Sequence, residues 1–154
     1  MSIPDLPPDF TFPRLVSKSD DIDFAFGVKR AAMGPHIIKR WGWDEEFQRK
    51  IHEDRFNAKN FFKIQFKKEA LGTLSYDVFE DHIRFGEFYI FPETQGQGIG
   101  SKILEHCLRQ AKSLFLPVRL EYLKWSPVGS LYKRHGFLEC GQSEHHYLMA
   151  LNLD

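Results

Sequence analysis

The sequence predicts a mixed α/β (α+β) fold whose central sheet is mostly antiparallel. Three apolar, alternating segments follow one another between residues 60 and 91 with short polar connections, which favours an antiparallel meander. A helical pattern then precedes a fourth strand pattern at 117–123, so the third and fourth strands can lie parallel through a right-handed crossover. With 154 residues and no repeat or long linker, we expect one domain, 1–154.

The N-terminal third of the sequence predicts helices behind a loose start. Residues 1–10 hold three prolines and are expected to form a loosely held arm. The helical pattern of 21–33 ends at a Gly-Pro pair, and because proline lacks a backbone donor, we expect a break there and a second helix from Pro35. Gly42 interrupts the second helix, and Asp44 can cap the piece that follows.

The remaining two thirds alternate between strand and helix patterns. Short apolar runs with alternating polarity predict strands, and longer runs with apolar residues three or four positions apart predict helices. In chain order the segments are the strands "NFFKIQF", "LGTLSYDVFE" and "IRFGEFYIF", the helix "SKILEHCLRQAKSLF", the strand "PVRLEYL", the short helix "SPVGSLYKRHGF", and a closing hairpin of "LECGQ" and "HHYLMALNL".

Composition and charge exclude several classes of protein. Lys and Arg number 21 and Asp and Glu also number 21, so the chain lacks the basic excess of a general nucleic-acid or anionic-membrane binder. No apolar run approaches the roughly 20 residues of a membrane-spanning helix, and the first ten residues lack the apolar stretch of a signal peptide. We therefore expect a cytoplasmic location. The two cysteines do not have metal-ligand spacing, and we expect no metal site.

The segment "PETQGQGIG" (92–100) predicts a phosphate-binding turn between a strand and a helix. A helix start exposes free N–H groups and carries about half a positive charge, and glycine lets an anion approach that backbone closely. Gly96, Gly98 and Gly100 supply such a start. Neighbouring side chains that can add hydrogen bonds or charge are Gln95, Gln97, Ser101 and Lys102.

The glycine spacing does not match two common nucleotide-binding motifs. A P-loop needs Gly-Lys-Ser/Thr, whereas this chain has Gly100-Ser101-Lys102. A dinucleotide fingerprint needs Gly-x-Gly-x-x-Gly early in a parallel unit, whereas these glycines follow a meander. Taken alone, the segment could also be a flexible turn without a ligand.

The context of the glycines resembles a known family. The pattern Gln95-x-x-Gly98-x-Gly100, with "FYIFPE" before it and an amphipathic helix after it, resembles the acetyl-CoA-binding motif of the GNAT superfamily of N-acetyltransferases. The later segment "WSPVGSLYKRHGF" resembles a second element of that superfamily through its Leu-Tyr and Gly-Phe pairs, 131–132 and 136–137. Ser126 departs from the usual Asn of this element, and Val128 departs from the frequent Ala.

The resemblance implies the GNAT fold, in which two central strands splay apart. Residues 86–113 would form the acetyl-CoA-binding strand, turn and helix, and the helices of 19–57 would shape the acceptor side. The implied activity is acetyl transfer from acetyl-CoA to a primary amine of a small molecule or peptide, by direct attack in a ternary complex. A homodimer is a further expectation. Two alternatives stay open, a non-catalytic acyl-CoA-binding or sensing module and a protein-interaction module.

The resemblance also implies which residues meet the cofactor. The pantetheine arm would pair with the backbone of Phe88, Tyr89 and Ile90. The remaining cofactor-binding residues implied by the motifs are Gln95, Gly96, Gln97, Gly98, Ile99, Gly100, Ser101, Ser126 and Tyr132. The 3′-phosphate could meet Lys102, Lys133 or Arg134.

Catalysis needs an acid for the leaving thiolate and a base for the amine. Tyr132 is the candidate acid, because a phenol with a pKa of about 10 is protonated at neutral pH, although it could instead pack on the cofactor. Candidate bases are Glu87, Glu121 and a chain of water molecules, and an ion pair is the alternative role for either carboxylate. Strict alternation would put Glu87 on the same face as Phe85 and Tyr89.

The acceptor side carries aromatic and acidic residues. Trp41 and Trp43 precede the acids 44–46 and could form a box for a cationic amine, although they could equally be packing residues at a capped helix start. Glu121 is a further candidate for substrate binding. The charged run "HEDRF" (52–56) is expected to be a solvated face. The adjacent pair 145–146, both His, cannot jointly chelate a metal on a strand, but one of them can line the pocket.

Overall fold

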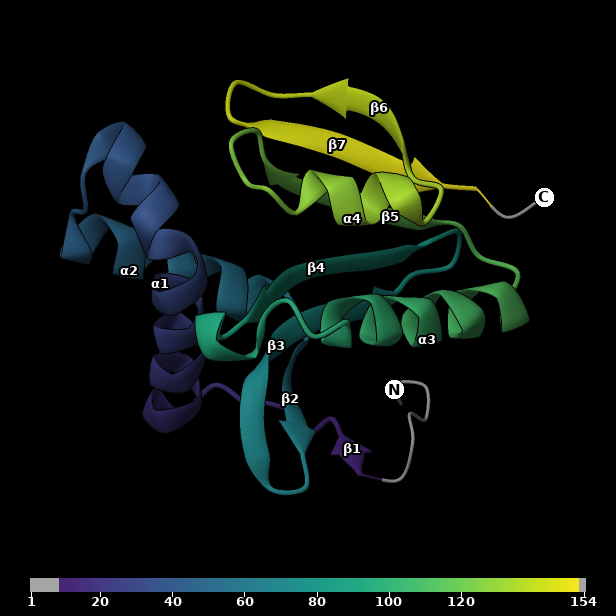
Figure 1. Cartoon of the computed structure of the whole chain (residues 1–154). Coiled ribbons are helices and arrows are strands. Elements are labelled where there is room, and N and C mark those ends of the chain that lie inside the picture. The colour runs from purple at the N-terminus through teal and green to yellow at the C-terminus, as the bar shows by residue number, and fades with distance from the viewer. Residues whose placement is uncertain (1–8, 153–154) are drawn as a thin grey trace.

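The structure, a computed structural model, describes residues 9–152, which form a seven-stranded sheet with helices packed around it (Figure 1). The strand order is β1-β2-β3-β4-β5-β7-β6; β4 and β5 pair in parallel and the other neighbours pair antiparallel. The elements are β1 (Phe10–Thr11), α1 (Ser19–Trp41), α2 (Glu45–Ala58), β2 (Phe61–Phe66), β3 (Glu69–Val78), β4 (Ile83–Ile90), the 3-10 helix η1 (Pro92–Thr94), α3 (Ile99–Ser113), β5 (Val118–Leu123), α4 (Gly129–Arg134), β6 (Leu138–Gln142) and β7 (His146–Leu151). The predicted mixed, mostly antiparallel fold is confirmed.

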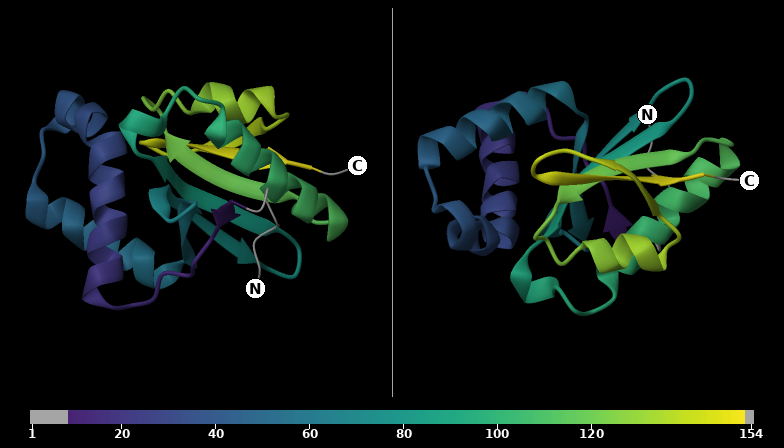
Figure 2. Two further views of the ribbon diagram at one scale, coloured as in Figure 1. Left: turned by 60° about the horizontal axis from the view of Figure 1, so that its bottom comes forward. Right: turned by 90° about the horizontal axis from the view of Figure 1, so that it is seen from above.

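The helices divide into two groups around the sheet (Figures 1 and 2). α3 and α4 lie on one face, and α1 and α2 lie together beside the C-terminal end of β4. The expected arm 1–10 lies outside the described residues as far as residue 8, and Phe10 already pairs with Phe66 in the sheet. None of the described helices is long and apolar enough to cross a membrane.

The prediction of a helix break at Gly34 and Pro35 is wrong, because α1 continues through both residues to Trp41. Proline inside a helix costs about 3 kcal/mol, but Met33, Gly34 and Ile37 are buried there, and burial of this turn offsets the cost. The interruption at Gly42 is confirmed, since this residue has φ 74° and donates its N–H to Ile38 to end the helix.

The cap of α2 and the main core also follow the sequence pattern. Asp44 Oδ1 accepts a hydrogen bond from the N–H of Phe47 at 3.0 Å, so the predicted cap is confirmed. The apolar stripe of α3 packs on the sheet to form the core. Its buried members are Ile103, Leu104, Cys107 and Ala111.

β4 and β5 separate soon after they meet. Their parallel pairing comprises Ile83 with Val118 and Arg84 with Arg119, and beyond these positions β4 pairs with β3 while β5 pairs with β7. The expected splayed central strands are therefore confirmed, and the backbone of β4 after Arg84 is left without a β5 partner.

A β-bulge lies in β4 where the strands separate. Leu74 of β3 stands opposite two residues of β4, Glu87 and Phe88. Glu87 has φ 44°, in the left-handed region that residues other than glycine rarely adopt. Thr73 Oγ1 donates a hydrogen bond to the carbonyl oxygen of Glu87 at 3.1 Å, which satisfies a group that the bulge takes out of the ladder.

The bulge changes which side chains share a face. Phe85 and Phe88 both point to the core face, with ring centroids 5.3 Å apart. Glu87 turns to the opposite face, where it meets Lys59 at the end of α2. The expectation that Glu87 shares a face with Phe85 is wrong, because the extra residue shifts the alternation by one position.

Candidate active site

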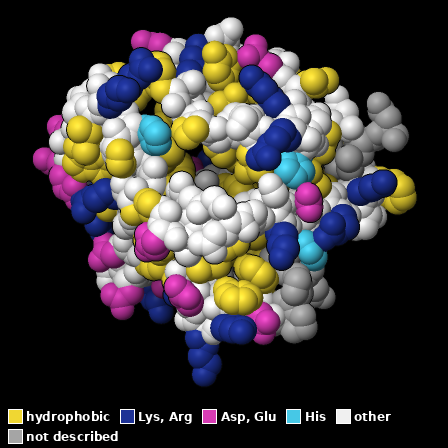
Figure 3. Space-filling model, in the orientation of Figure 1, with side chains coloured by type: hydrophobic (Ala, Val, Ile, Leu, Met, Phe, Trp, Pro, Cys, Tyr) yellow, Lys and Arg dark blue, Asp and Glu magenta, His cyan; other side chains and the backbone are white. Residues whose placement is uncertain are grey.

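A cavity of about 1030 Å³ opens between the separated strands β4 and β5. It is lined by residues 85–90 of β4 and 119–123 of β5, by the glycine turn, and by residues of α1, α2 and α4. Figure 3 shows the face of Figure 1 hollowed near its centre, with apolar and basic side chains around the hollow. One continuous space therefore joins the predicted cofactor side to the predicted acceptor side.

The three glycines of the turn are required for two different structural reasons, a left-handed backbone conformation and a close approach of neighbouring elements. Gly96 and Gly98 have φ of 80° and 78°, so the chain needs residues that tolerate the left-handed region. Gly100 has an ordinary φ, but a Cβ atom there would lie 3.6 Å from Ile90 Cδ1 and 3.8 Å from Leu131 Cδ2. The glycine at 100 therefore lets the start of α3 approach both β4 and α4. Gly98 begins α3 without a side-chain cap, so the first N–H groups of the helix are free for a ligand.

The glutamines of the turn support its backbone. Gln95 Nε2 donates to the carbonyl oxygen of Ile90 at 2.8 Å, and Gln97 Nε2 donates to that of Glu93 at 3.5 Å. Gln97 lies outside the cavity lining. The predicted residues of the turn that do line the cavity are Gln95, Gly96, Gly98, Ile99, Gly100 and Ser101.

The second motif places Ser126 and Tyr132 at the cavity. Ser126 Oγ accepts a hydrogen bond from the N–H of Val128 at 3.3 Å, so serine supports the approach to α4 where the family usually has Asn. Tyr132 is 3% exposed, and its ring lies beside Tyr122 and Phe137 at centroid distances of 5.8 and 5.7 Å. Burial raises the pKa of the Tyr132 phenol well above its usual value, and the charge of Glu87 adds to the rise. The phenol is therefore a protonated donor at neutral pH.

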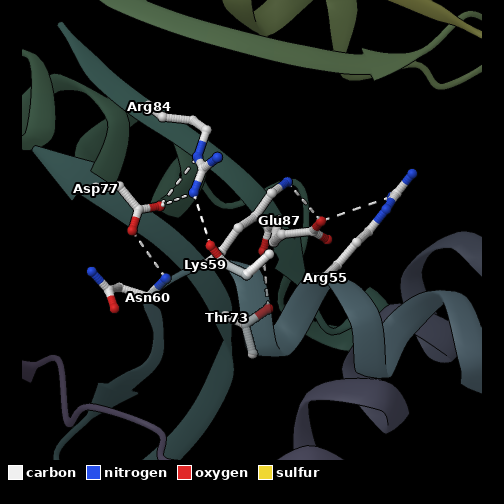
Figure 4. A network of polar contacts seen from close by, with 8 residues as sticks. Arg55, Lys59, Asn60, Thr73, Asp77, Arg84 and Glu87 are labelled. Carbon is white, nitrogen blue, oxygen red and sulfur yellow. Dashed lines mark hydrogen bonds and ion pairs between the residues drawn. The ribbon is translucent and has the colours of Figure 1, made fainter. Parts of the chain in front are cut away.

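Glu87 is held in an ion-pair network (Figure 4). Lys59 Nζ donates to Glu87 Oε1 at 3.1 Å, and Arg55 Nη1 lies 3.8 Å from the same oxygen. Burial works to raise the pKa of Glu87, but the charges of Lys59, Arg55 and Lys29 outweigh it and hold that pKa below the usual value. The carboxylate is thus ionised and paired, and its role as a base stays a prediction.

The comparisons with known proteins agree with this geometry. The family model described as an acetyltransferase (GNAT) domain matches residues 57–139. The chain belongs to the GNAT family. No curated protein sequence matches the chain significantly.

Solved GNAT structures share the fold over almost the whole chain. The PaiA N-acetyltransferase of Thermoplasma acidophilum in complex with coenzyme A has a TM-score of 0.70 at 16% identity, covering 94% of this chain and 99% of its own. The ribosomal-protein-S18-alanine N-acetyltransferase of Escherichia coli has a TM-score of 0.64 at 17% identity, covering 94% and 96%. The ribosomal L7/L12 alpha-N-protein acetyltransferase RimL in complex with coenzyme A has a TM-score of 0.66 at 16% identity, covering 99% of each chain.

The predicted acceptor side of the cavity gathers charged groups from several parts of the chain. These groups are Arg55 of α2, Lys59 just after α2, Glu87 of β4, Glu121 of β5 and His146 of β7. Burial lowers the pKa of His146, although the charge of Glu121 opposes the change. The imidazole is therefore neutral at neutral pH.

Sequence reasoning missed Arg55 and Lys59 as site residues, whereas it allowed for one residue of the pair 145–146 in the pocket, and His146 is the one that lines the cavity. The expectation that "HEDRF" is a solvated face is wrong: His52 and Phe56 are buried, and Arg55 lines the cavity. The spacing of the charged residues in this run does not reveal which face of α2 packs on the sheet.

The two predicted aromatic residues lie away from the cavity lining. The Trp41 ring packs against Trp125 and His145, with centroid distances of 4.7 and 5.2 Å. Trp43 packs beside Phe26, and its Nε1 donates to Glu45 Oε2 at 2.6 Å. The structure therefore brings neither tryptophan to the cavity and gives both the packing contacts that the sequence left open as an alternative.

Residues 9–152 contain no group of three or more His, Cys, Asp or Glu side chains placed to hold a metal ion.

Proposed function

We propose that this GNAT acetyltransferase moves an acetyl group from acetyl-CoA to a primary amine of a small molecule or peptide, by direct attack in a ternary complex. The observation that carries the proposal is the single cavity that connects the glycine turn, the unpaired part of β4 and Tyr132. This arrangement provides a separate position for the phosphates, the thioester and the acceptor.

The cofactor half of the cavity fits the chemistry of coenzyme A. The backbone of Phe88, Tyr89 and Ile90 lacks a β5 partner and can pair with the amides of the pantetheine arm as a strand would. The pyrophosphate would lie on the free N–H groups at the start of α3. Arg134, the last residue of α4, lines the cavity and is the proposed contact of the 3′-phosphate, whereas Lys102 and Lys133 lie outside the lining.

The transfer itself needs one bond formed and one broken. The amine nitrogen attacks the thioester carbonyl carbon, a C–N bond forms and the C–S bond breaks. The thiolate takes a proton from Tyr132, and the proton released by the amine passes to Glu87, Glu121 or water. The raised pKa keeps Tyr132 protonated at neutral pH, so its phenol is available as a donor to the developing thiolate, and after donation it regains a proton from solvent.

A peptide amine is supported by two structural neighbours. One is a ribosomal-protein-S18-alanine N-acetyltransferase and another is a ribosomal L7/L12 alpha-N-protein acetyltransferase, so both are named for acetylation of a ribosomal protein. A small-molecule amine is the second acceptor class, and a homodimer remains a prediction.

The test is acetyl-CoA turnover by the full chain over a panel of peptide and small-molecule amines, read as thiol release and as acetylated product by mass. A non-catalytic acyl-CoA-binding module would be stabilised by CoA but would give no amine-dependent thiol. Ligand at 100 times its dissociation constant stabilises a fold by about 2.7 kcal/mol. A chain whose thermal unfolding is unchanged by saturating CoA would contradict the proposed function as a whole.

A further inference from the structure

Arg55 presents unused hydrogen-bond donors to the acceptor side of the cavity. Its side chain lines the cavity and is 30% exposed. Within residues 9–152 no hydrogen bond from its guanidinium group is found, and its ion-pair contact with Glu87 Oε1, at 3.8 Å, is too long to be one. Figure 4 shows Arg55 reaching past Glu87 from α2. A guanidinium group that is partly withdrawn from water and lacks a hydrogen-bonded acceptor is suited to bind an anion.

The carboxylate that contacts Arg55 is shared with a closer partner. Glu87 Oε1 accepts its hydrogen bond from Lys59 at 3.1 Å, whereas Arg55 forms only the longer ion pair with the same oxygen. Asp77 lies on the other side of Lys59 from Arg55 in Figure 4, where Arg84 at 3.2 Å and the N–H of Asn60 at 3.1 Å hold its carboxylate. Arg55 therefore shares the single negative charge of Glu87 with Lys59.

The charge around Glu87 is positive. Arg55 and Lys59 line the cavity and both pair with the one carboxylate of Glu87, and the charge of Lys29 acts on it as well. Arg84, another cation of the lining, is instead paired with Asp77 at 3.2 Å. Because positive charge withdrawn from water is stabilised by a paired anion, an acceptor that brings a negative group would balance this site.

Groups on other elements share the cavity with Arg55. Glu121 of β5 and His146 of β7 line the same cavity, and the charges of Arg55 and Glu87 both act on the pKa of His146. An anion bound to Arg55 would therefore share this space with Glu121 and His146.

We propose that Arg55 binds an oxyanion of the acceptor, so that the substrates are amines that also carry a carboxylate or phosphate group. This rests on the proposed function and narrows its substrate class. The planar guanidinium group can hold either oxyanion through two parallel hydrogen bonds. The neighbouring cations also favour the neutral form of the acceptor amine, which is the form that attacks the thioester.

The test compares matched acceptors that differ in the oxyanion: amino acids with their carboxamides, and O-phosphoethanolamine with ethanolamine. The wild-type chain should favour the oxyanion-bearing member by about tenfold or more in kcat/KM. Arg55→Gln should remove that preference by lowering kcat/KM for this member, mainly through KM. Arg55→Lys, which keeps the charge but not the planar group, should retain part of it. A preference in the amino-acid pair alone would indicate a carboxylate ligand, and a preference in the O-phosphoethanolamine pair alone would indicate a phosphate ligand.

Lys50→Gln is the matched control, because Lys50 lies on the same helix and pairs with Asp54 at an exposed position. It should leave the preference for the oxyanion-bearing acceptor unchanged.

The proposal is overturned if the wild-type chain acetylates both members of each acceptor pair equally well. It is also overturned if Arg55→Gln and Arg55→Lys keep the full preference while their thermal unfolding curves show that they are folded. If no pair turns over, calorimetric titration of the same compounds onto the CoA-saturated chain decides: binding that needs the oxyanion and Arg55 supports the proposal, and its absence overturns it. Failure of CoA itself to bind would instead overturn the proposed function.

Discussion

Lys59 Nζ donates a hydrogen bond to Glu87 Oε1 at 3.1 Å, joining the residue that ends α2 to the bulge of β4. The contact exists because Glu87 adopts a left-handed conformation and so leaves the core face of the sheet. In a regular strand this carboxylate would lie with Phe85 against apolar side chains. The bulge thus places a negative charge beside α2 and fixes that helix over the cavity.

Glu87→Gln should destabilise the fold by about 3 kcal/mol at neutral pH, because removing one partner of a buried ion pair leaves the other charges uncompensated. The pKa of Glu87 is lowered in the folded chain, so its contribution is present above the unfolded pKa, near 4.5, and is lost as pH falls through the folded pKa. Denaturant unfolding at pH 7 and in acid measures both effects. Glu53→Gln, which removes an exposed acid paired with Arg49, is the control. Equal stability of wild type and Glu87→Gln at pH 7 would contradict this account.

Features that rest on local signals could be predicted from the sequence. The glycine turn, Tyr132 and the Asp44 cap each depend on a few neighbouring residues whose backbone requirements are specific. The parallel placement of the fourth strand followed from the helical pattern between 101 and 115. The separation of β4 and β5 came from the family resemblance, since alternation alone does not reveal where two strands stop pairing.

Features set by tertiary contacts could not be predicted. Glu87 occupies a left-handed position usually taken by glycine, so no residue type marked the bulge. Pro35 lies inside α1 because the helical turn around it is buried. The helix propensities of the residues give no information about that burial. Arg55 and Lys59 become site residues through the way α2 docks on β4, and a charged run on a helix gives no information about the docked face.

Gly98→Glu should lower the affinity for CoA by about 100-fold or more, equivalent to about 2.7 kcal/mol, because it adds bulk and negative charge where the diphosphate would bind. Calorimetric titration with CoA measures the change. Gly42→Glu is a matched control: Gly42 has φ 74° against 78° for Gly98, and no atom lies within 4 Å of a Cβ built at either position. The two positions differ in ψ, −175° at Gly42 and 4° at Gly98, so Gly42→Glu carries the greater backbone strain, and it lies at the end of α1 away from the turn. A loss of CoA affinity in Gly98→Glu that is absent in Gly42→Glu therefore cannot come from backbone strain. Unchanged CoA affinity in Gly98→Glu would contradict the assignment of the phosphate site.

Tyr132→Phe should lower kcat by about 100-fold or more if the phenol protonates the leaving thiolate, while CoA affinity stays close to that of wild type. Because the folded pKa of Tyr132 is raised, wild-type activity should show no loss from ionisation of this phenol as pH approaches its ordinary value of 10. Tyr147→Phe removes a hydroxyl from a ring that packs on Tyr122 and serves as the control. If turnover is unaltered under conditions where chemistry limits the rate, Tyr132 has a packing role.

Lys29→Met tests the cost of burying a lysine on α1. Burial lowers the pKa of Lys29 to about 8 from 10.5, and Glu87 offsets part of that change. Below pH 8 both the folded and the unfolded chain hold the proton, so folding bears the full cost of burying the ammonium group. Between pH 8 and 10.5 the folded chain releases it first, and the stability of wild type relative to Lys29→Met should therefore rise with pH.

The measurement is the difference in unfolding free energy between wild type and Lys29→Met at several pH values from 7 to 10. Other groups that titrate in this range, such as the buried Cys107, affect both proteins alike and cancel in the difference. Lys39→Met, at an exposed position of the same helix, should give a difference that does not change with pH. A flat difference for Lys29→Met would mean that the Lys29 ammonium group is paired well enough with Glu87 to keep its ordinary pKa.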